Sequence, residues 1–98
     1  MDQFVQLKKI IEENNSFLLS THVNPDADAL GSELAFYLIL KKLGKKIRIV
    51  NHSATPYNLE FMDEEKVIEK FDPAIHENIF NEAEIFILLE DVIQSNVF

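Results

Sequence analysis

The sequence contains no cysteine and little glycine or proline. Without cysteine the chain can form no disulfide, no cysteine-ligated zinc site, no iron–sulfur cluster and no thiol nucleophile. Any metal must therefore be held by histidine and carboxylate side chains. With two glycines, three prolines and no low-complexity tract, the 98 residues contain no recognisable linker. The chain is expected to be one domain, or part of one.

Basic residues and long apolar runs are also scarce. Nine lysine and arginine residues stand against 17 aspartate and glutamate residues, which gives a formal charge of −8 and a pI near 4.7. Because this charge repels long polyanions, binding to long duplex DNA is not expected. The longest apolar run, Leu34 to Leu40, is far shorter than the roughly 18 residues of a membrane span. No membrane partner is expected, and a cytoplasmic location is predicted.

What is present is a regular succession of apolar patterns. Helical spacing predicts helices over residues 2–14 and 29–43, the second ended by Gly44 in a left-handed conformation. Short apolar runs predict buried strands over 16–21, 47–50 and 85–89. Asp72 followed by Pro73 predicts the start of one short helix over 73–81, and the segment 61–71 stays unassigned.

This order of elements predicts the fold class. Helices and strands alternate along the chain, which is typical of an α/β layered unit with right-handed crossovers. The expected architecture is a partial three-layer Rossmann-like unit with a short parallel sheet.

The segment from His22 to Ser32, His-Val-Asn-Pro-Asp-Ala-Asp-Ala-Leu-Gly-Ser, joins a predicted strand to a predicted helix. Asp26 and Asp28 lie two residues apart in a turn that Pro25 stiffens, so their carboxylates can converge with the His22 imidazole. Carboxylate oxygens with one imidazole suit Mn²⁺ or Mg²⁺. Two carboxylates this close repel each other unless a cation or the positive end of the following helix compensates. The pattern predicts a metal site.

Each of these residues also has an ordinary structural explanation. Asp28 can be a helix N-cap, Asp26 a turn former and His22 a polar residue at a strand end. Those explanations leave the grouping of all three at one strand end unexplained. Of the other histidines, His52 could face the site but is more simply a surface residue, and His76 is expected to be solvated on a polar helix.

The same segment, with the strand before it and the helix after it, resembles the first motif of the DHH (Asp-His-His) phosphoesterase family. It is most similar to the bacterial bifunctional oligoribonuclease and 3′-phosphoadenosine-5′-phosphate phosphatase type, the nano-RNases. The resemblance covers about residues 4–89 and depends on this one motif.

The resemblance implies a two-Mn²⁺ site that activates a water for attack on a phosphate ester, with Mg²⁺ as an alternative metal. His22 and Asp26 would bind one metal and Asp28 the other. Gly31 and Ser32 would let the helix start approach a phosphate. No catalytic residue is implied beyond the metal ligands, and the implied substrate is a short oligonucleotide or a nucleotide phosphate.

The family's second motif is an aspartate after the third strand that bridges the two metals. Here the strand is followed by Glu90-Asp91, so the bridging role falls to Asp91 or, in a register one residue shorter, to Glu90. The seven residues after Asp91 contain no histidine and no acid. The Asp-His-His motif, the fourth metal-binding aspartate and the C-terminal substrate-binding domain therefore have no counterpart. Residues 1–98 are expected to be the N-terminal part of such a domain, ended by truncation, a frameshift or a split gene.

The missing elements bear on stability and on function. Unpaired sheet edges and an uncovered apolar strand predict low stability, self-association or a second chain that completes the site. The alternative to an active hydrolase is a catalytically inactive product or a metal- or partner-binding module. A nucleotide-binding α/β domain without chemistry is a weaker alternative, because no Gly-x-Gly-x-x-Gly or Gly-x-x-x-x-Gly-Lys loop follows any predicted strand.

Overall fold

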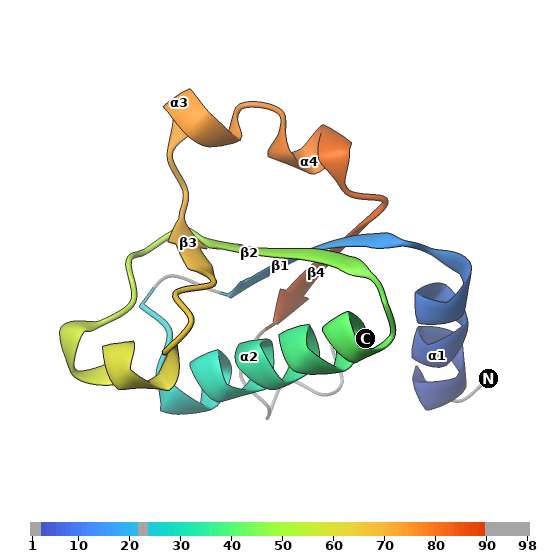
Figure 1. Cartoon of the computed structure of the whole chain (residues 1–98), viewed down its shortest axis with the longest axis horizontal. Coiled ribbons are helices and arrows are strands. Elements are labelled where there is room, and N and C mark those ends of the chain that lie inside the picture. The colour runs from blue at the N-terminus through green and yellow to red at the C-terminus, as the bar shows by residue number, and fades with distance from the viewer. Residues whose placement is uncertain (1–2, 22–23, 90–98) are drawn as a thin grey trace.

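A computed structural model of the chain describes residues 3–21 and 24–89 (Figure 1). The elements in chain order are α1 (Gln3–Glu13), β1 (Ser16–Thr21), α2 (Ala27–Lys42), β2 (Lys46–Asn51), the 3₁₀ helix η1 (Tyr57–Met62), β3 (Ile68–Lys70), α3 (Pro73–His76), α4 (Ile79–Glu82) and β4 (Ile85–Leu89). The four described strands are all parallel and lie in the order β3-β2-β1-β4. The predicted fold class is confirmed: this is an α/β fold with a Rossmann-like parallel sheet flanked by helices.

The strand order reverses at β1. β2 and β3 lie on one side of β1, and β4 lies on the other. Thr21 and Leu89, the last residues of β1 and β4, are register partners in the sheet. Ligands of open parallel sheets bind outside the carboxyl ends of the strands at such a reversal point. The fold therefore marks the carboxyl ends of β1 and β4 as its natural ligand position.

The two faces of the sheet are covered unequally. Figure 1 shows α2 along one face and the short α3 and α4 over the other. Successive strand residues point to opposite faces, so β1 contributes to two separate cores. The core on the α2 side is built on Phe17, Leu19, Leu40 and Ile49. The smaller core under α4 is built on Leu18, Val50 and Ile79.

Two elements differ from the sequence prediction. The unassigned segment 61–71 contains β3, so the described sheet has four strands rather than three. The carboxylate of Asp63 fixes the start of β3, because it accepts hydrogen bonds from the backbone N–H groups of Val67 and Ile68, both at 2.9 Å. The single helix expected over 73–81 is two helices, α3 and α4, because Asn78 leaves helical geometry with φ −109° and ψ 18°.

The strand predicted over 85–89 forms, but it is half-buried rather than buried. Ile85 and Ile87 pack against the core on the α2 side. On the other face Phe86 is 48% and Leu88 43% exposed, although the ring of Phe80 from α4 contacts the Phe86 ring edge-on with 5.3 Å between the centroids. Within the described residues β4 pairs with β1 alone, which makes it an edge strand whose second apolar face is only partly covered.

Candidate functional site

The loop between β1 and α2 stands at the reversal point of the sheet. Asn24 adopts φ 57° directly before Pro25, a left-handed conformation that asparagine adopts more readily than other residues with a side chain. The backbone N–H of Asn24 donates to Oγ of Ser53 at 3.3 Å, so this loop touches the loop that follows β2.

Asp26 is the N-cap of α2. Its backbone is extended, and its Oδ1 accepts a hydrogen bond from the backbone N–H of Ala29 at 2.9 Å. The alternative in which Asp28 is the cap is therefore wrong. Asp28 lies exposed in the first turn of α2, where the helix dipole favours an acid. Because the cap is two residues earlier, α2 begins at Ala27 rather than at the predicted residue 29.

The two carboxylates keep oxygen atoms available. Within residues 3–21 and 24–89, Oδ2 of Asp26 and the carboxylate of Asp28 have no hydrogen-bond or ion-pair partner. Exposed carboxylate oxygens are the donors that Mn²⁺ and Mg²⁺ prefer, so the chemistry of this pair fits the predicted metals. The same described ranges contain no group of three or more potential metal ligands. The other predicted ligands, His22 and either Asp91 or Glu90, lie outside the described residues.

The predicted phosphate-binding residues lie deeper in α2 than the helix start. The helix's own hydrogen bonds begin with Leu30, whose N–H donates to the carbonyl of Asp26 at 3.0 Å. The N–H groups of Gly31 and Ser32 follow within this ladder, so they are not free to bind an anion. Gly31 is half-buried and Ser32 is exposed, which leaves the Ser32 hydroxyl as the group that can reach a phosphate. The phosphate-binding role of this pair stays a prediction.

A buried polar network connects the elements around the loop. The amide Nδ2 of Asn51 donates to Oε1 of Glu33 at 2.9 Å, and Oδ1 of Asn51 accepts from the backbone N–H of Thr21 at 3.1 Å. Glu33 and Asn51 are both 0% exposed. Burial raises the pKa of Glu33 to about 7; the hydrogen bond from Asn51 opposes this rise and the negative charge of Asp63 adds to it.

The sequence analysis missed Glu33 and Asn51. Their signal was available only in part: Glu33 follows Leu30 by three residues and precedes Leu40 by seven, so all three share one helix face. Leu30 and Leu40 are completely buried, as is Glu33. The sequence shows an acid among apolar residues of this helix, and only the structure shows that its face is the buried one.

Two histidines lie within the described residues, His52 beside Ser53 in the loop that contacts Asn24, and His76 in α3. His52 is exposed after β2 and, with Phe71 and Phe86, lines an apolar cavity of about 240 Å³ on the face covered by α3 and α4. The prediction that His76 is solvated is wrong, since it is 3% exposed. The backbone N–H of Asp72 donates to its Nδ1 at 2.9 Å, so Nε2 carries the proton and donates to Glu69 at 3.0 Å.

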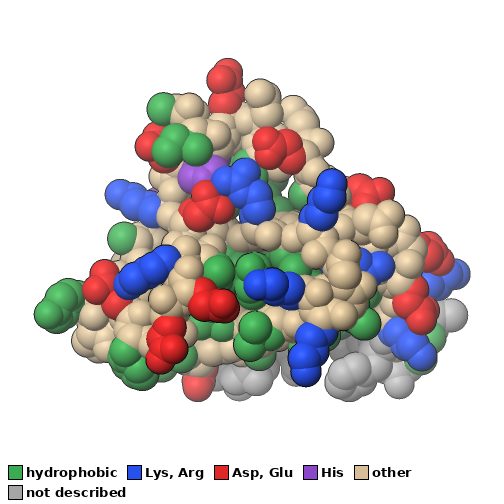
Figure 2. Space-filling model, viewed as in Figure 1, with side chains coloured by type: hydrophobic (Ala, Val, Ile, Leu, Met, Phe, Trp, Pro, Cys, Tyr) green, Lys and Arg blue, Asp and Glu red, His purple; other side chains and the backbone are tan. Residues whose placement is uncertain are grey.

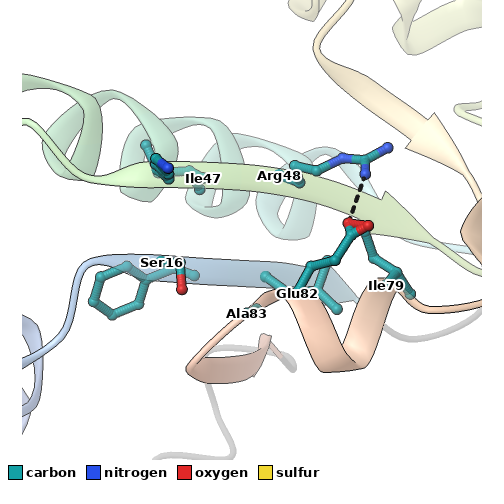
Figure 3. Close-up of a pocket in the computed structure, with 9 residues that line it drawn as sticks. Ser16, Ile47, Arg48, Ile79, Glu82 and Ala83 are labelled. Carbon is teal, nitrogen blue, oxygen red and sulfur yellow. Dashed lines mark hydrogen bonds and ion pairs between the residues drawn. The ribbon is translucent and has the colours of Figure 1, made fainter.

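A second cavity, of about 300 Å³, opens at the opposite end of the sheet (Figure 3). It is lined by the first residues of β1 and β2, including Ser16, and by α4. Arg48 stands at this cavity and pairs with Glu82 at 3.5 Å and, through two nitrogens, with Glu69 at 2.7 and 3.1 Å. These pairs fasten α4 and β3 to β2. Since the cavity lies at the amino ends of the strands, it is separate from the loop that carries Asp26.

Charged side chains of both signs are mixed on the face shown in Figure 2, with apolar side chains exposed between them. That face offers no continuous basic stripe of the kind that follows a nucleic-acid backbone. None of the described helices is long and apolar enough to cross a membrane. Which molecules bind the chain stays a prediction.

Comparisons of the chain with protein-family models, with curated proteins and with solved structures found no match. The resemblance to the DHH phosphoesterases therefore depends on the motif residues alone.

Proposed function

We propose that the chain is part of a metal-dependent phosphoesterase domain of the DHH type, whose parent hydrolyses short oligonucleotides or nucleotide 3′-phosphates in the cytoplasm. One observation carries the proposal. Asp26 and Asp28 stand exposed at the start of α2, at the point where the strand order of the parallel sheet reverses. This is the position where α/β folds bind ligands, and it holds the residue types that the motif requires.

In this proposal His22 and Asp26 would hold one Mn²⁺ and Asp28 the second, and Asp91 or Glu90 would serve as the ligand that both metals share. Two bound cations lower the pKa of a metal-bound water and neutralise charge on the attacking and leaving oxygens of a phosphate ester. Asp26 serves two purposes at once. Its Oδ1 is held by the N–H of Ala29. That bond fixes the orientation of the carboxylate and leaves Oδ2 to face a metal.

The charge of the chain supports short substrates. With a net charge of −8 the protein repels a long polyanion, whereas bound cations can attract the few phosphates of a dinucleotide.

The experiment is Mn²⁺-dependent release of mononucleotide from a dinucleotide, measured together with Mn²⁺ binding. Asp26→Asn is the decisive variant, because asparagine caps a helix as well as aspartate does but offers no carboxylate. We expect the activity to fall by about 100-fold or more, since even partners of metal ligands contribute about 10- to 100-fold. The matched control is Asp72→Asn, the same substitution at the N-cap of α3, which should leave the activity unchanged.

The outcomes separate the proposal from its alternative. Full activity in Asp26→Asn would reject the assignment of the site. A folded chain that binds Mn²⁺ through Asp26 but releases no nucleotide would favour a catalytically inactive metal-binding module. A folded chain without binding or hydrolysis would contradict both.

A further inference from the structure

Glu33 and Asn51 connect the two elements between which the candidate loop runs. β1 ends at Thr21 and α2 begins at Ala27. The Asn51 side chain accepts from the Thr21 N–H with one atom and donates to Glu33 with the other. Two hydrogen bonds through one amide therefore join the end of the central strand to the second turn of the helix. Both bonds are shielded from water, since Thr21 is 3% exposed and its partners are 0% exposed.

The geometry favours a neutral Glu33. Its Oε2 is buried and has no hydrogen-bond partner in the part of the chain that the structure describes. A carboxylate enclosed with one hydrogen bond and no counterion is costly, and the protonated acid costs less because it carries no charge. The raised pKa of Glu33, which burial holds at about 7, agrees with this geometry.

No described neighbour supplies a compensating positive charge. β2 offers the neutral amide of Asn51, and β1 offers the backbone of Thr21. From the segment after η1, the Asp63 carboxylate acts on Glu33 and is itself negative. The residues one turn away on α2 are uncharged at neutral pH: Ala29, Leu30, Phe36 and Tyr37.

We propose that neutral Glu33 is a positioning residue that, through Asn51, locks the carboxyl end of β1 to α2 and so sets the loop that carries Asp26. Loss of the Glu33 proton places an uncompensated charge next to Asp63 in the core. The ionised Oε1 holds the Asn51 amide more strongly, but the unpartnered Oε2 draws water into the core, which disturbs the packing between α2 and the end of β1. The loop is therefore held most firmly below neutral pH. The proposal is independent of the proposed function, because the network exists whatever the loop binds.

The test is an NMR titration of the isotopically labelled full chain from about pH 5 to 9. We expect the Glu33 carboxyl carbon to titrate with a midpoint at about 7. The Thr21 backbone amide and the Asn51 side-chain amide should shift with the same midpoint. In Glu33→Gln that component should be lost from both amides. The control variant Glu65→Gln, which replaces an exposed glutamate, should still show the component with a midpoint at about 7 in both amides.

Three results would overturn the proposal. One is a Glu33 carbon that is fully ionised across the whole range. Another is a Glu33 titration that the Thr21 and Asn51 amides do not follow. The third is an unchanged titration of those amides in Glu33→Gln. The carbon measurement is made on the unaltered chain, so the first two results can be reached even if the variant does not fold.

Discussion

A single buried acid gives this protein an unusual dependence of stability on pH. The pKa of Glu33 is raised by burial from 4.5 to about 7 in the folded chain. Because the folded-state pKa lies above the unfolded one, the contribution of Glu33 to stability is complete below pH 4.5 and is lost as the pH rises through about 7. Lowering the pH from about 7 to 4.5 should therefore stabilise this part of the fold.

In the variant Glu33→Gln the side chain at position 33 is neutral at every pH. The free energy of unfolding of this variant should exceed that of the unaltered chain by roughly 3 kcal/mol at about pH 8, and the two should converge near about pH 4. Urea unfolding at several pH values measures the difference. A gap between the two proteins that stays constant with pH would contradict the assignment of a raised pKa to Glu33.

Individual side chains differ in how far they could be predicted. Asp26 and Asp28 were predicted as a site because their spacing in a turn is local information. Which of the two acids caps α2 could not be predicted, because this depends on the residue at which the first turn of the helix closes. The burial of Glu33 and His76 depends on which helix face meets the sheet. In α2 apolar residues occupy most of the circumference, so the sequence pattern leaves that face undetermined.

Replacing each of the two glycines by alanine is expected to change stability in opposite directions. Gly44 ends α2 with φ 79°, and an added Cβ would meet nothing within 4 Å. Gly44→Ala should therefore cost about 1 to 2 kcal/mol of stability from backbone strain alone. Gly31 lies inside α2, and an added Cβ would meet Met62 at an ordinary 3.6 Å. Gly31→Ala should stabilise the chain by about 0.5 to 1 kcal/mol.

Thermal or urea unfolding of both glycine variants checks these signs. Destabilisation by Gly31→Ala would show that the packing against η1 is tighter than the structure has it. If Gly31→Ala is stable but loses nucleotide hydrolysis, the glycine is needed at a phosphate, as the motif resemblance implies.

Regular elements were predicted better than short ones. β1, β2, β4, α1 and α2 follow from apolar runs and helical spacing, and their observed bounds differ from the predicted ones by two residues or fewer. β3 has three residues and no pattern of its own. It depends on tertiary contacts: the Asp63 carboxylate at its start, and the N–H of Phe71 on the carbonyl of Asn51 at 2.7 Å after its end. Such contacts cannot be deduced from local sequence.

For the molecule as a whole, the partly covered apolar face of β4 predicts self-association. Phe86 and Leu88 expose apolar side chains beside an edge that has no further strand in the described part of the chain. We expect a concentration-dependent rise in mass by analytical ultracentrifugation. Leu88→Lys should lower it, because a charge on an edge strand opposes pairing. Tyr57→Lys, on the 89% exposed side chain of η1, is the matched control and should have no effect. A monomer at every concentration would contradict the prediction.

Strand order is the property of the whole molecule that assembles the candidate site. The alternation of helices and strands predicted a parallel sheet, and the position of the loop after a buried strand predicted a ligand site. The reversal at β1 could not be predicted, because it requires pairing between strands nearly 70 residues apart, such as Phe17 with Ile85. That pairing places the end of β4 beside the end of β1.

The most direct test of the metal site is to locate bound Mn²⁺ by the line broadening that it causes in the amide NMR spectrum of the chain. The account predicts that substoichiometric Mn²⁺ first broadens the amides of residues 24–32 and those near the ends of β1 and β4, and that Asp26→Asn abolishes this selective effect. Because the chain carries a net charge of −8, Mn²⁺ could instead bind weakly to acidic residues all over the surface, and the experiment must distinguish this from binding at the site. Broadening that begins at other acidic segments, such as 63–65, or that is unchanged in Asp26→Asn, would contradict the account.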